Sequence, residues 1–380
     1  MIVSPIRQDR NRQQWKKRLE RDETHYYPCM KLFPFTLPAF LLAFFLWFPG
    51  LLLVACGTGG AGALRLQGET MGTTWSVIVV PGDNHPLQAA PVRSGIEQVL
   101  RVVNDRMSTW QPDSELSRFN RNRTTNWFPV SSELVDVVEA ARGISEISAG
   151  IYDVTVGPLV NLWGFGAGQA GTQPVPAEAE IEAARARVGF QHLETREQPP
   201  ALRKQQPDMY VDLSSIAKGY GVDQVGEYLE AQGSGRYMVE IGGEVRTLGL
   251  SPRGDAWRIA IEKPVDLGRA VQQGLKLERG GLATSGDYRN FFTENSRRYS
   301  HTIDPVSGRP VIHRLASVSV LAQNTMLADG YATLLMAMGE VKGREFALEH
   351  GIDAFFIWRT EHGFDSFATD GFRQLLVAPD

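Results

Sequence analysis

Apolar residues along the first half of the chain recur at spacings typical of both strands and helices. The run TWSVIVV, Thr74–Val80, is rich in β-branched residues and predicts a β-strand. From Val92 to Met107 apolar residues recur every three or four positions, which is the spacing of one face of an amphipathic helix. A second helix is expected from a Ser131 cap to a stop at Gly150.

The second half of the chain is predicted to be rich in strands. Short apolar runs at Tyr237–Ile241, Glu244–Leu250 and Trp257–Ile261 are separated by Gly-Gly and by Pro-Arg-Gly-Asp, a pattern typical of an antiparallel meander. Helices and strands are therefore mixed without strict alternation, which favours an α+β fold over a doubly wound parallel sheet. No linker of domain size follows residue 64, so we expect a single domain.

The N-terminal region carries a targeting pattern. Residues 32–55 hold no charged side chain, and the sequence LVAC ending at Cys56 resembles the lipobox at which bacterial lipoproteins are cleaved and acylated. We interpret residues 30–55 as a lipoprotein signal peptide and 56–64 as the acylated cysteine with a tether. Residues 1–29 are then an extended n-region or untranslated sequence. An uncleaved membrane span is the alternative, but the segment contains three prolines.

Composition and charge exclude some partners. With 43% hydrophobic and 22% charged residues, the chain has the composition of an ordinary globular protein. Without residues 1–55, its 31 basic and 39 acidic residues give a net charge of −8. Nucleic acid is therefore not expected as a partner, because its phosphates would be repelled.

The helix expected at Leu327–Gly339, LADGYATLLMAMG, is almost entirely apolar and should be largely buried. Asp329 is its only charged residue, and a buried carboxylate needs a partner or a bound cation. Thr333 follows one turn later, so a hydroxyl and a carboxylate share one face. This oxygen pair suits Mg²⁺. The alternative is that Asp329 is stabilised simply by lying near the N-terminus of its helix.

The segment YVDLSSIAKGYGVDQVGEYL, Tyr210–Leu229, predicts a strand ending at Asp212, a Ser-Ser cap and a helix. Lys218 falls in the first turn of that helix, where the helix dipole disfavours a cation. An anionic ligand or a neighbouring carboxylate would explain this position, since helix N-termini bind anions. An ordinary solvated lysine is the alternative.

Two turn-rich segments are candidates for functional groups. GFGAGQAGTQPVPAEAE, residues 164–180, leads into a helix that ends near Gly189; its GxGxG pattern follows no clear strand, so a plain loop is favoured over a phosphate-binding one. SHTIDPVSG, Ser300–Gly308, brings His301 close to Asp304 in a turn. Turns on a rigid scaffold often hold catalytic groups, although Asp before Pro is also ordinary turn chemistry.

Five motifs occur in a fixed order along the chain. They are MGTTW at Met71–Trp75, YDVTVGPLVNLWGFG at Tyr152–Gly166, VDLSSIAKGYGVD at Val211–Asp223, SGDYRNF with SHTIDPVSG between Ser285 and Gly308, and MLADGYATLLMAMG at Met326–Gly339. In order and spacing they resemble the ApbE family of FAD:protein FMN transferases. The resemblance covers about residues 65–375.

This resemblance implies a single-domain α+β fold with an antiparallel sheet and an active site between the two halves of the chain. It also implies that the protein binds FAD with Mg²⁺ and transfers FMN onto a threonine hydroxyl of an acceptor protein, releasing AMP. Some members instead hydrolyse FAD to FMN and AMP; a flavin-holding lipoprotein without activity is a third alternative. The family's acceptors imply membrane redox subunits as partners and a lipid-anchored location facing the periplasm, with the inner membrane favoured.

Matched motif by motif, the resemblance implies roles for individual residues. The Mg²⁺ ligands would be Asp329, Thr333 and the backbone carbonyl of Ser215. His301 would be the base that deprotonates the acceptor threonine, and Asp304 would orient that imidazole or contact the flavin. Contacts to FAD would be made by Met71, Trp110, Tyr152, Asp153, Val154, Asp212, Lys218 and Ile303.

These roles agree with what phosphoryl transfer requires of a protein, namely positioning, a metal on the phosphate oxygens and a base. An imidazole with the ordinary pKa of about 6.5 is largely neutral near neutral pH and can accept a proton. The chain departs from the family pattern at Ser214-Ser215, where glycine or alanine is common, and at Trp110, where tyrosine is usual. A carbonyl ligand tolerates the first change, and stacking on an aromatic face tolerates the second.

Overall fold

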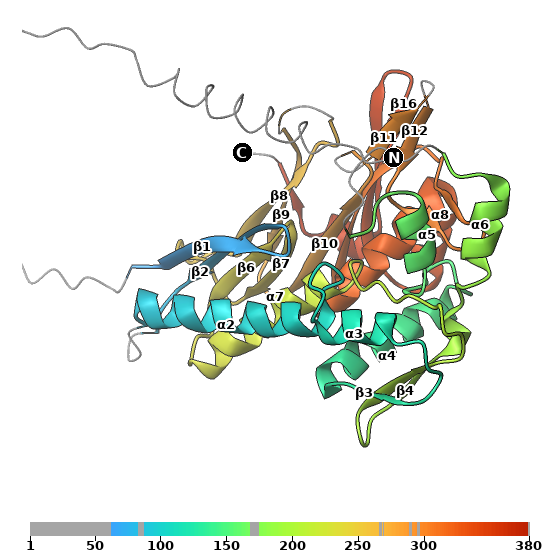
Figure 1. Cartoon of the computed structure of the whole chain (residues 1–380). Helices are drawn as coiled ribbons and strands as arrows, with labels where there is room; N and C mark the ends of the chain where they lie inside the picture. The colour runs from blue at the N-terminus through green and yellow to red at the C-terminus, as the bar shows by residue number, and fades with distance from the viewer. Residues whose placement is uncertain are drawn as a thin grey trace, which may run out of the picture. The chain divides into compact units, whose positions relative to one another are not determined.

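The computed structural model describes residues 62–82, 87–167, 175–265, 268, 270–288, 291–294 and 297–378. Its largest element is an eight-stranded sheet in the order β1-β2-β6-β7-β10-β15-β16-β17 (Figure 1), with every neighbouring pair antiparallel. The strands are β1 (Leu64–Thr70), β2 (Thr73–Val79), β6 (Tyr237–Ile241), β7 (Glu244–Leu248), β10 (Gly280–Gly286), β15 (Leu315–Ala322), β16 (Asp353–Thr360) and β17 (Gly363–Ala368). The predicted α+β fold with an antiparallel sheet is confirmed.

Helices α2 (Ala89–Met107) and α7 (Ala217–Ala231) lie along one face of this sheet (Figure 1). Trp75 and Val77 alternate along β2 toward that face and belong to the same buried cluster as Ile96 of α2. The period-2 pattern of the strand and the 3.6-residue period of the helix therefore meet in one core. The strand and the first helix expected from the sequence are confirmed close to their predicted bounds.

The longest helix, α8 (Thr325–Glu349), packs against β10 and β15 on the same face. Inside it, Gly339 adopts a left-handed φ of 80° and interrupts the helical conformation, so a second helical part continues from there to Glu349. The apolar segment predicted to end at Gly339 is thus confirmed, while its start lies two residues earlier than expected, at Thr325.

A second, three-stranded sheet covers the opposite face of the main sheet. Its order is β18-β9-β8, with β8 (Trp257–Glu262), β9 (Val271–Leu277) and β18 (Leu376–Val377). Ile261 and Leu275 pack there against Val245 and Leu282. The predicted meander is therefore only partly right: β6 and β7 pair, but β8 leaves for the second sheet, because its apolar face is buried against the first.

A helical region lies beyond one end of α2. It contains α3 (Glu115–Arg121), α4 (Ser132–Ile147) and a small sheet in the order β3-β5-β4, formed by β3 (Phe128–Pro129), β5 (Ala201–Lys204) and β4 (Leu193–Arg196). The predicted Ser131 cap is confirmed, since its hydroxyl accepts a hydrogen bond from the Leu134 N–H at 3.4 Å. The helix ends at Ile147, just before Gly150 takes a left-handed φ of 83°.

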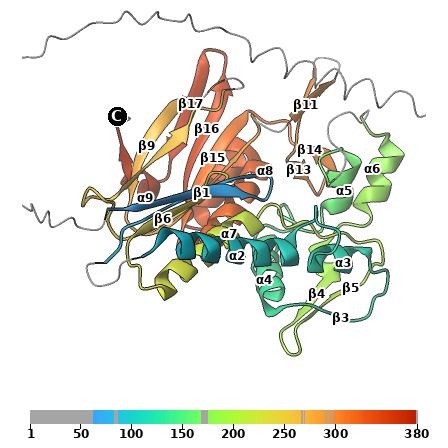
Figure 2. The same ribbon diagram turned by 60° about the vertical axis from the view of Figure 1, so that its left-hand side comes forward.

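Short elements gather beside α8 (Figure 2): α5 (Gly157–Leu162), α6 (Glu178–Arg185) and the hairpin of β13 (Ile303–Asp304) and β14 (Arg309–Pro310). The helix predicted after the glycine-rich loop is α6. Trp163 ties this group together, because its indole N–H donates to the Gly308 carbonyl at 2.8 Å. The remaining elements are η2 (Phe190–His192), β11 (Phe291–Glu294), β12 (Arg297–Ser300) and α9 (Asp370–Arg373).

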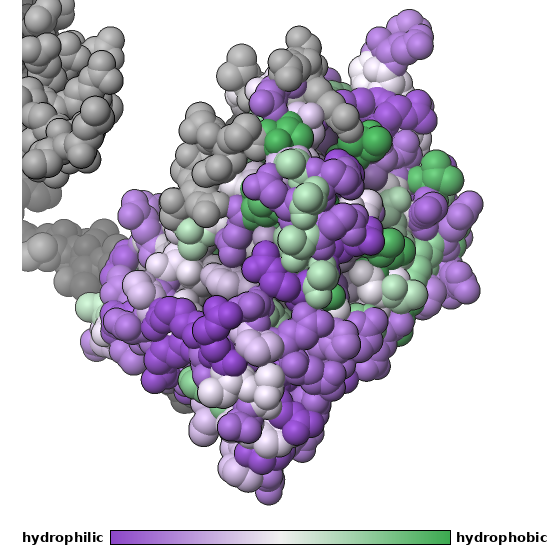
Figure 3. All heavy atoms as spheres, turned by 45° about the vertical axis from the view of Figure 1, so that its right-hand side comes forward, coloured by the Kyte–Doolittle hydropathy of each residue, from purple (hydrophilic) through white to green (hydrophobic). Residues whose placement is uncertain are grey.

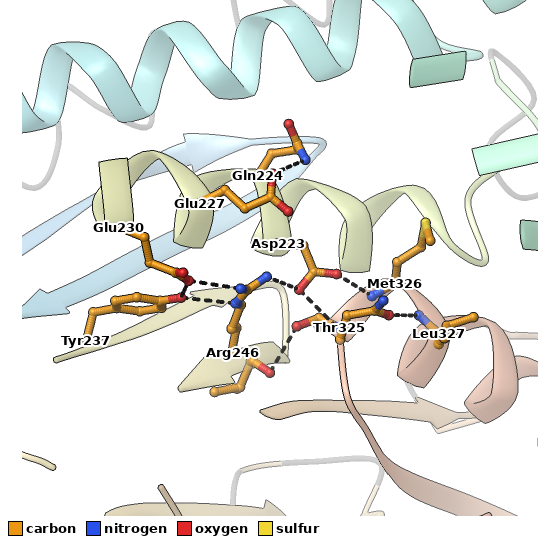
Figure 4. A network of polar contacts seen from close by, with 11 residues as sticks. Asp223, Gln224, Glu227, Glu230, Tyr237, Arg246, Thr325, Met326 and Leu327 are labelled. Carbon is orange, nitrogen blue, oxygen red and sulfur yellow. Dashed lines mark hydrogen bonds and ion pairs between the residues drawn. The ribbon is translucent and has the colours of Figure 1, made fainter. Parts of the chain in front are cut away.

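The N-termini of α7 and α8 are capped by carboxylates that each helix supplies to the other. Asp223 of α7 accepts hydrogen bonds from the N–H groups of Thr325 (3.0 Å) and Met326 (2.8 Å) at the start of α8, as Figure 4 shows. Asp329 of α8 in turn accepts from the Gly219 N–H in the first turn of α7 at 3.0 Å. Three of the amides at these helix ends are thereby satisfied, and the Asn324 side chain accepts from a fourth, that of Leu327 at 2.9 Å.

Gly219 lies where the two helices approach most closely. A Cβ atom there would meet the Thr325 carbonyl and lie 2.8 Å from the Met326 Cα, which is too close for any side chain. The conformation before α7 also differs from the prediction. Tyr210 forms only a single bridge with Val156, so the predicted strand is wrong, and no side chain of the Ser-Ser pair caps α7. Asp329 supplies the cap instead.

The predicted N-terminal parts lie outside the described residues, including residues 1–29, the signal peptide at 30–55 and Cys56. In the part of the chain that is described, no helix combines the length and the apolar character needed to cross a membrane. The face drawn in Figure 3 is mostly polar, with hydrophobic residues in small separate groups. This mixed surface is ordinary for a folded domain.

We expect Asp223→Ala to lower the free energy of unfolding by about 2–4 kcal/mol, because it removes the cap of α8 and one carboxylate partner of the Arg246 guanidinium at 3.1 Å. Urea unfolding measures the loss. Asp223→Asn, which keeps an acceptor oxygen, should lose less. Glu227→Ala, on the exposed side of the same helix (Figure 4), is the control and should change stability by under about 0.5 kcal/mol. Equal losses for Asp223→Ala and Glu227→Ala would contradict the capping role.

Candidate active site

One cavity of about 480 Å³ brings together most of the residues predicted to act. It lies between the start of α7, the first half of α8, the end of β10 and the turn after β12. Ten of the predicted site residues line it: Trp110, Tyr152, Asp153, Asp212, Ser215, Lys218, His301, Ile303, Asp329 and Thr333. Segments that are far apart in sequence therefore meet at one place.

A second hollow of about 920 Å³ adjoins this cavity and contains Met71. Thr109, Trp110, Ser214 and Lys218 line both spaces, so the two are continuous. The Trp110 side chain is 65% exposed at this junction, which leaves its ring face open for stacking. Apolar residues such as Leu100, Val103 and Met107 line part of the hollow, and Glu69, Glu97 and Arg101 line the rest with polar residues.

Three charged side chains form the polar end of the cavity. The Lys218 ammonium lies 2.7 Å from a carboxylate oxygen of Glu244 and 3.8 Å from one of Asp329. Burial alone would lower the pKa of Lys218, but the charges of Asp329 and Glu244 outweigh it and raise that pKa. The lysine is therefore cationic. The predicted carboxylate partner of Lys218 is confirmed, and it is in fact two carboxylates.

Glu244 and Asp329 are both buried, and burial raises the pKa of each carboxyl group. For Glu244, burial together with the charge of Asp329 raises the pKa to about 7, although the charge of Lys218 lowers it. The Oε2 atom of Glu244 is buried without a hydrogen-bond partner among the described residues. Two buried carboxylates thus share one lysine, an arrangement that a further cation would stabilise.

Neutral oxygen atoms lie beside this charged cluster. The Thr333 hydroxyl is 3.3 Å from that of Ser285, and the Ser215 hydroxyl is 2.9 Å from that of Tyr152. Burial raises the pKa of the Tyr152 phenol, which therefore stays protonated. Because the Gly219 amide bonds to Asp329, the Ser215 carbonyl lacks the helical partner that this amide would otherwise provide.

The donor set of Asp329, Thr333 and the Ser215 carbonyl fits Mg²⁺ better than zinc, because all three donors are oxygen atoms. The described residues contain no group of three or more His, Cys, Asp and Glu side chains able to hold a metal by themselves. Mg²⁺ commonly takes one or two protein carboxylates and completes its shell with phosphate oxygens and water. The site thus suits a metal bound together with a phosphorylated ligand.

Two predicted contact residues hold the cavity wall through their own hydrogen bonds. Asp153 accepts from the Thr155 N–H and hydroxyl, both at 2.7 Å, and from the Phe190 N–H at 2.8 Å. Burial raises the pKa of this carboxyl group. The Asp212 N–H donates to the Val154 carbonyl at 2.7 Å, which joins the two wall segments and explains the place of Val154 behind the surface.

The turn predicted to be functional carries His301 into the cavity. Its imidazole packs edge-on against Phe165, with ring centroids 6.3 Å apart. The two carboxylate oxygens of Asp304 accept from the N–H groups of Val306 (3.0 Å) and Ser307 (3.2 Å) within the same turn. Asp304 therefore fixes the turn that bears His301.

Residues 71–356, three quarters of the chain, match a protein-family model described as "ApbE family". The chain belongs to the ApbE family. The resemblance inferred from the five motifs is thereby confirmed.

Curated relatives and solved structures similar to this ApbE-family chain are named as flavin transferases. Proteins named FAD:protein FMN transferase from Vibrio cholerae and Haemophilus influenzae are 46% and 43% identical to it, over 86% and 82% of this chain and 96% and 91% of their own lengths. The solved structure of the flavin transferase ApbE from Vibrio cholerae is 44% identical, with a TM-score of 0.76, over 83% of this chain and 99% of that one. The flavinyl transferase ApbE from Pseudomonas stutzeri is 39% identical, with a TM-score of 0.75, over 82% and 96%.

Sequence reasoning missed Glu244, although it lies against Lys218 at the centre of the polar cluster. The Gly242-Gly243 pair before it was interpreted only as a turn between strands. The available signal was a carboxylate directly after two glycines at the start of a buried strand. Both glycines adopt left-handed φ, of 61° and 109°, so this turn needs glycine and delivers Glu244 to the cavity.

Proposed function

We propose that this ApbE-family chain is a Mg²⁺-dependent FMN transferase. It moves FMN from FAD onto a threonine hydroxyl of an acceptor protein, forms a phosphoester bond and releases AMP. The names of its relatives support the reaction class. The observation that carries the proposal is that one cavity holds Asp329 and Thr333, the cation Lys218 and the imidazole of His301 together.

Asp329, Thr333 and the Ser215 carbonyl would hold the metal ion at the polar end of the cavity. When bound, Mg²⁺ would withdraw negative charge from the diphosphate of FAD. Lys218 faces the same space and contributes a fixed positive charge, held in place by Glu244. Such preorganised charge is the main contribution that proteins make to phosphoryl transfer.

His301 accepts the proton of the acceptor threonine as the hydroxyl oxygen bonds to the FMN phosphorus. The bond from that phosphorus to the AMP phosphate oxygen breaks, so AMP leaves with the electron pair. Asp304 holds the turn so that the imidazole faces the cavity. The protein thus supplies position and a proton acceptor, as general-base catalysis requires.

The two ring systems of FAD need apolar and aromatic surface. Trp110 and Met71 offer it at the wide hollow, and Ile303 and Tyr152 offer it in the cavity. Asp153 and Asp212 line the cavity, and Val154 supports them from behind through its hydrogen bond with the Asp212 N–H. If water replaced threonine, the same residues would serve an FAD pyrophosphatase, and a site that only holds flavin would need neither His301 nor the metal ligands.

The proposed location is a lipid anchor at Cys56, facing the periplasm and favouring the inner membrane. Membrane redox subunits bearing a target threonine are then the expected acceptors. The support is the uncharged segment 32–55 and the LVAC sequence that follows it.

The base role of His301 is tested by His301→Asn. We expect transfer to fall by roughly 10²-fold or more while FAD affinity stays unchanged, because asparagine cannot take the proton. Flavin fluorescence on denatured acceptor measures transfer, and equilibrium titration measures FAD binding. His350→Asn, an exposed histidine at the end of α8, is the matched control. Weaker FAD binding with normal turnover of the bound fraction would refute the base role.

The metal role of Asp329 is tested by Asp329→Asn. This change keeps an acceptor for the Gly219 amide but removes the charge, so Mg²⁺ affinity in the presence of FAD should fall by roughly 10–100-fold. Isothermal titration calorimetry measures it independently of turnover. Glu340→Gln, at a buried carboxylate further along α8 that does not line the cavity, is the control and should keep wild-type Mg²⁺ affinity. Unchanged affinity in Asp329→Asn would reject the ligand assignment.

The anchor is tested by mass spectrometry of the protein isolated from bacterial membranes. We expect a mature N-terminus at Cys56 carrying acyl chains, because the lipobox directs cleavage before that cysteine. Cys56→Ser is the control and should leave residues 30–55 attached. Unmodified Cys56 still joined to residues 30–55 in the wild type would disprove the assignment.

A further inference from the structure

A groove of about 490 Å³ runs along the face of the main sheet that α2 and α7 leave uncovered. Its floor is made by side chains that alternate along neighbouring strands, with Ser76 from β2, Met238 and Glu240 from β6, Val245 from β7 and Leu282 from β10. Its wall is different, because five consecutive residues of β8, 258–262, line it. Consecutive residues line a groove together only when the edge of the strand faces it.

The outer edge of β8 presents backbone groups to this groove. β8 is the last strand of the β18-β9-β8 sheet in the described part of the chain. The Lys276 N–H donates to the Leu375 carbonyl at 2.9 Å, so the backbone polar groups of Lys276 point toward β18. Those of Gly274, two residues earlier on the same strand, point the same way. Gly274 pairs with Ala260. Because an antiparallel strand alternates its hydrogen-bonding sides, the N–H and C=O of Ala260 point away from β9, to the open edge.

The groove adjoins the proposed catalytic cavity near the ends of β6 and β10. Gly242, Thr284 and Gly286 line both spaces. The Trp257 indole N–H donates to the Leu248 carbonyl at 3.4 Å, which places the start of β8 at the end of β7 away from the Gly242-Gly243 turn. A chain lying along β8 would therefore have one end directed to the cavity that holds His301.

We propose that this groove binds the acceptor protein as an extended segment paired with the edge of β8, with its target threonine delivered past Gly242 and Gly286 to His301. The inference rests on the proposed transferase function and adds the surface that recognises the acceptor. An added strand extends the second sheet and covers the free part of the main sheet, as in other cases of β-strand addition.

The chemistry of the groove favours a polypeptide in this position. Backbone pairing along β8 suits only another main chain. Of the apolar floor residues, Val245 and Leu282 are already buried against the second sheet, and Met238 is the one that stays partly exposed. Glu240 is bonded to the Ser76 hydroxyl (3.1 Å) and the Gly243 N–H (2.8 Å). The floor therefore demands no fixed charge from the acceptor, and recognition comes mainly from main-chain pairing.

Ala260→Pro tests the pairing. Proline removes the outward N–H of Ala260 but leaves the ladder to β9, because that N–H takes no part in it. The probe is a short synthetic peptide with a central threonine, selected from a randomised library for transfer by the wild-type enzyme. We expect the KM for this peptide to rise about tenfold or more, with FAD affinity and thermal stability unchanged.

Two variants serve as controls. Ala260→Val keeps the N–H and a strand-forming residue, and should keep wild-type KM. Ser366→Pro places proline at an outward N–H on β17, the exposed edge of the main sheet, far along the strand order from the groove. The Arg359 N–H donates to the Arg314 carbonyl, so the backbone polar groups of Arg359, and of Ile357 two residues before it, point toward β15. Ser366 pairs with Ile357 across β16 and β17, and its N–H therefore points outward. This variant should also keep wild-type KM.

The probe peptide itself gives an independent test. Two peptides are compared, one N-methylated at every odd-numbered residue and the other at every even-numbered residue. One of them should lose transfer and the other should keep it, because only every second amide of the peptide pairs with β8. Equal KM for Ala260→Pro and Ser366→Pro, or indifference to methylation, would overturn the groove while leaving the transferase function intact. Absence of any transfer by the wild type would instead reject the function on which the inference rests.

Hydrogen exchange at the outward N–H of Ala260, measured by NMR, separates the occupants, because this amide takes no part in the ladder to β9. Protection that appears on adding the peptide supports the proposal. Protection that is already present without the peptide would overturn the proposal. If that protection does not depend on enzyme concentration, the occupant is a segment of the same chain. If it rises with enzyme concentration, the occupant is a second copy of the protein.

Discussion

The structure depends on two buried carboxylates through which α7 and α8 cap each other's N-termini. Each helix begins with amides that no residue of its own helix can satisfy, and each receives a buried aspartate from its neighbour, Asp223 in one direction and Asp329 in the other. The approach is close enough that only glycine fits at Gly219. Because Ser215 lies just before α7 and the two helices carry Lys218, Asp329 and Thr333, the contact that joins them also sets the geometry of the cavity.

The same contact concentrates charge. Asp329 caps α7 and also faces Lys218, which in turn is paired with Glu244 at the Gly242-Gly243 turn. Buried carboxylates are costly unless compensated, and one lysine serves two of them here. A cavity with this surplus of buried negative charge favours a cation, and a cation favours a phosphorylated ligand. The electrostatics of the fold and the chemistry proposed for it therefore follow from one arrangement.

The cavity is open in two directions, and this agrees with a reaction between two large partners. On one side it continues into the hollow at Met71 and Trp110, which suits a long ligand with flat rings. On the other it adjoins the groove beside β8, where Gly242, Thr284 and Gly286 line both spaces. In the proposed reaction, donor and acceptor would therefore reach the cavity from different sides, beside the turn that Asp304 holds.

The sequence by itself determined the elements whose information is local. The apolar spacing of Val92–Met107, the Ser131 cap and the stop at Gly339 each act within a few residues, and the structure reproduces them. The motifs likewise identified the family and, with it, ten of the residues that line the cavity. Asp329 was recognised as a buried charge in need of a partner because its neighbours along the helix are apolar.

Only the tertiary structure decided which partners those groups have. Asp329 is stabilised at a helix N-terminus, but that of α7 and not that of its own helix, and it replaces the cap expected from Ser214-Ser215. Glu244 is important because of Lys218, which is near in space and distant in sequence. β8 joins a second sheet because its buried face meets Val245 and Leu282. Caps, ion pairs and sheet membership between distant segments depend on which surfaces pack together, and no local pattern of residues specifies that packing.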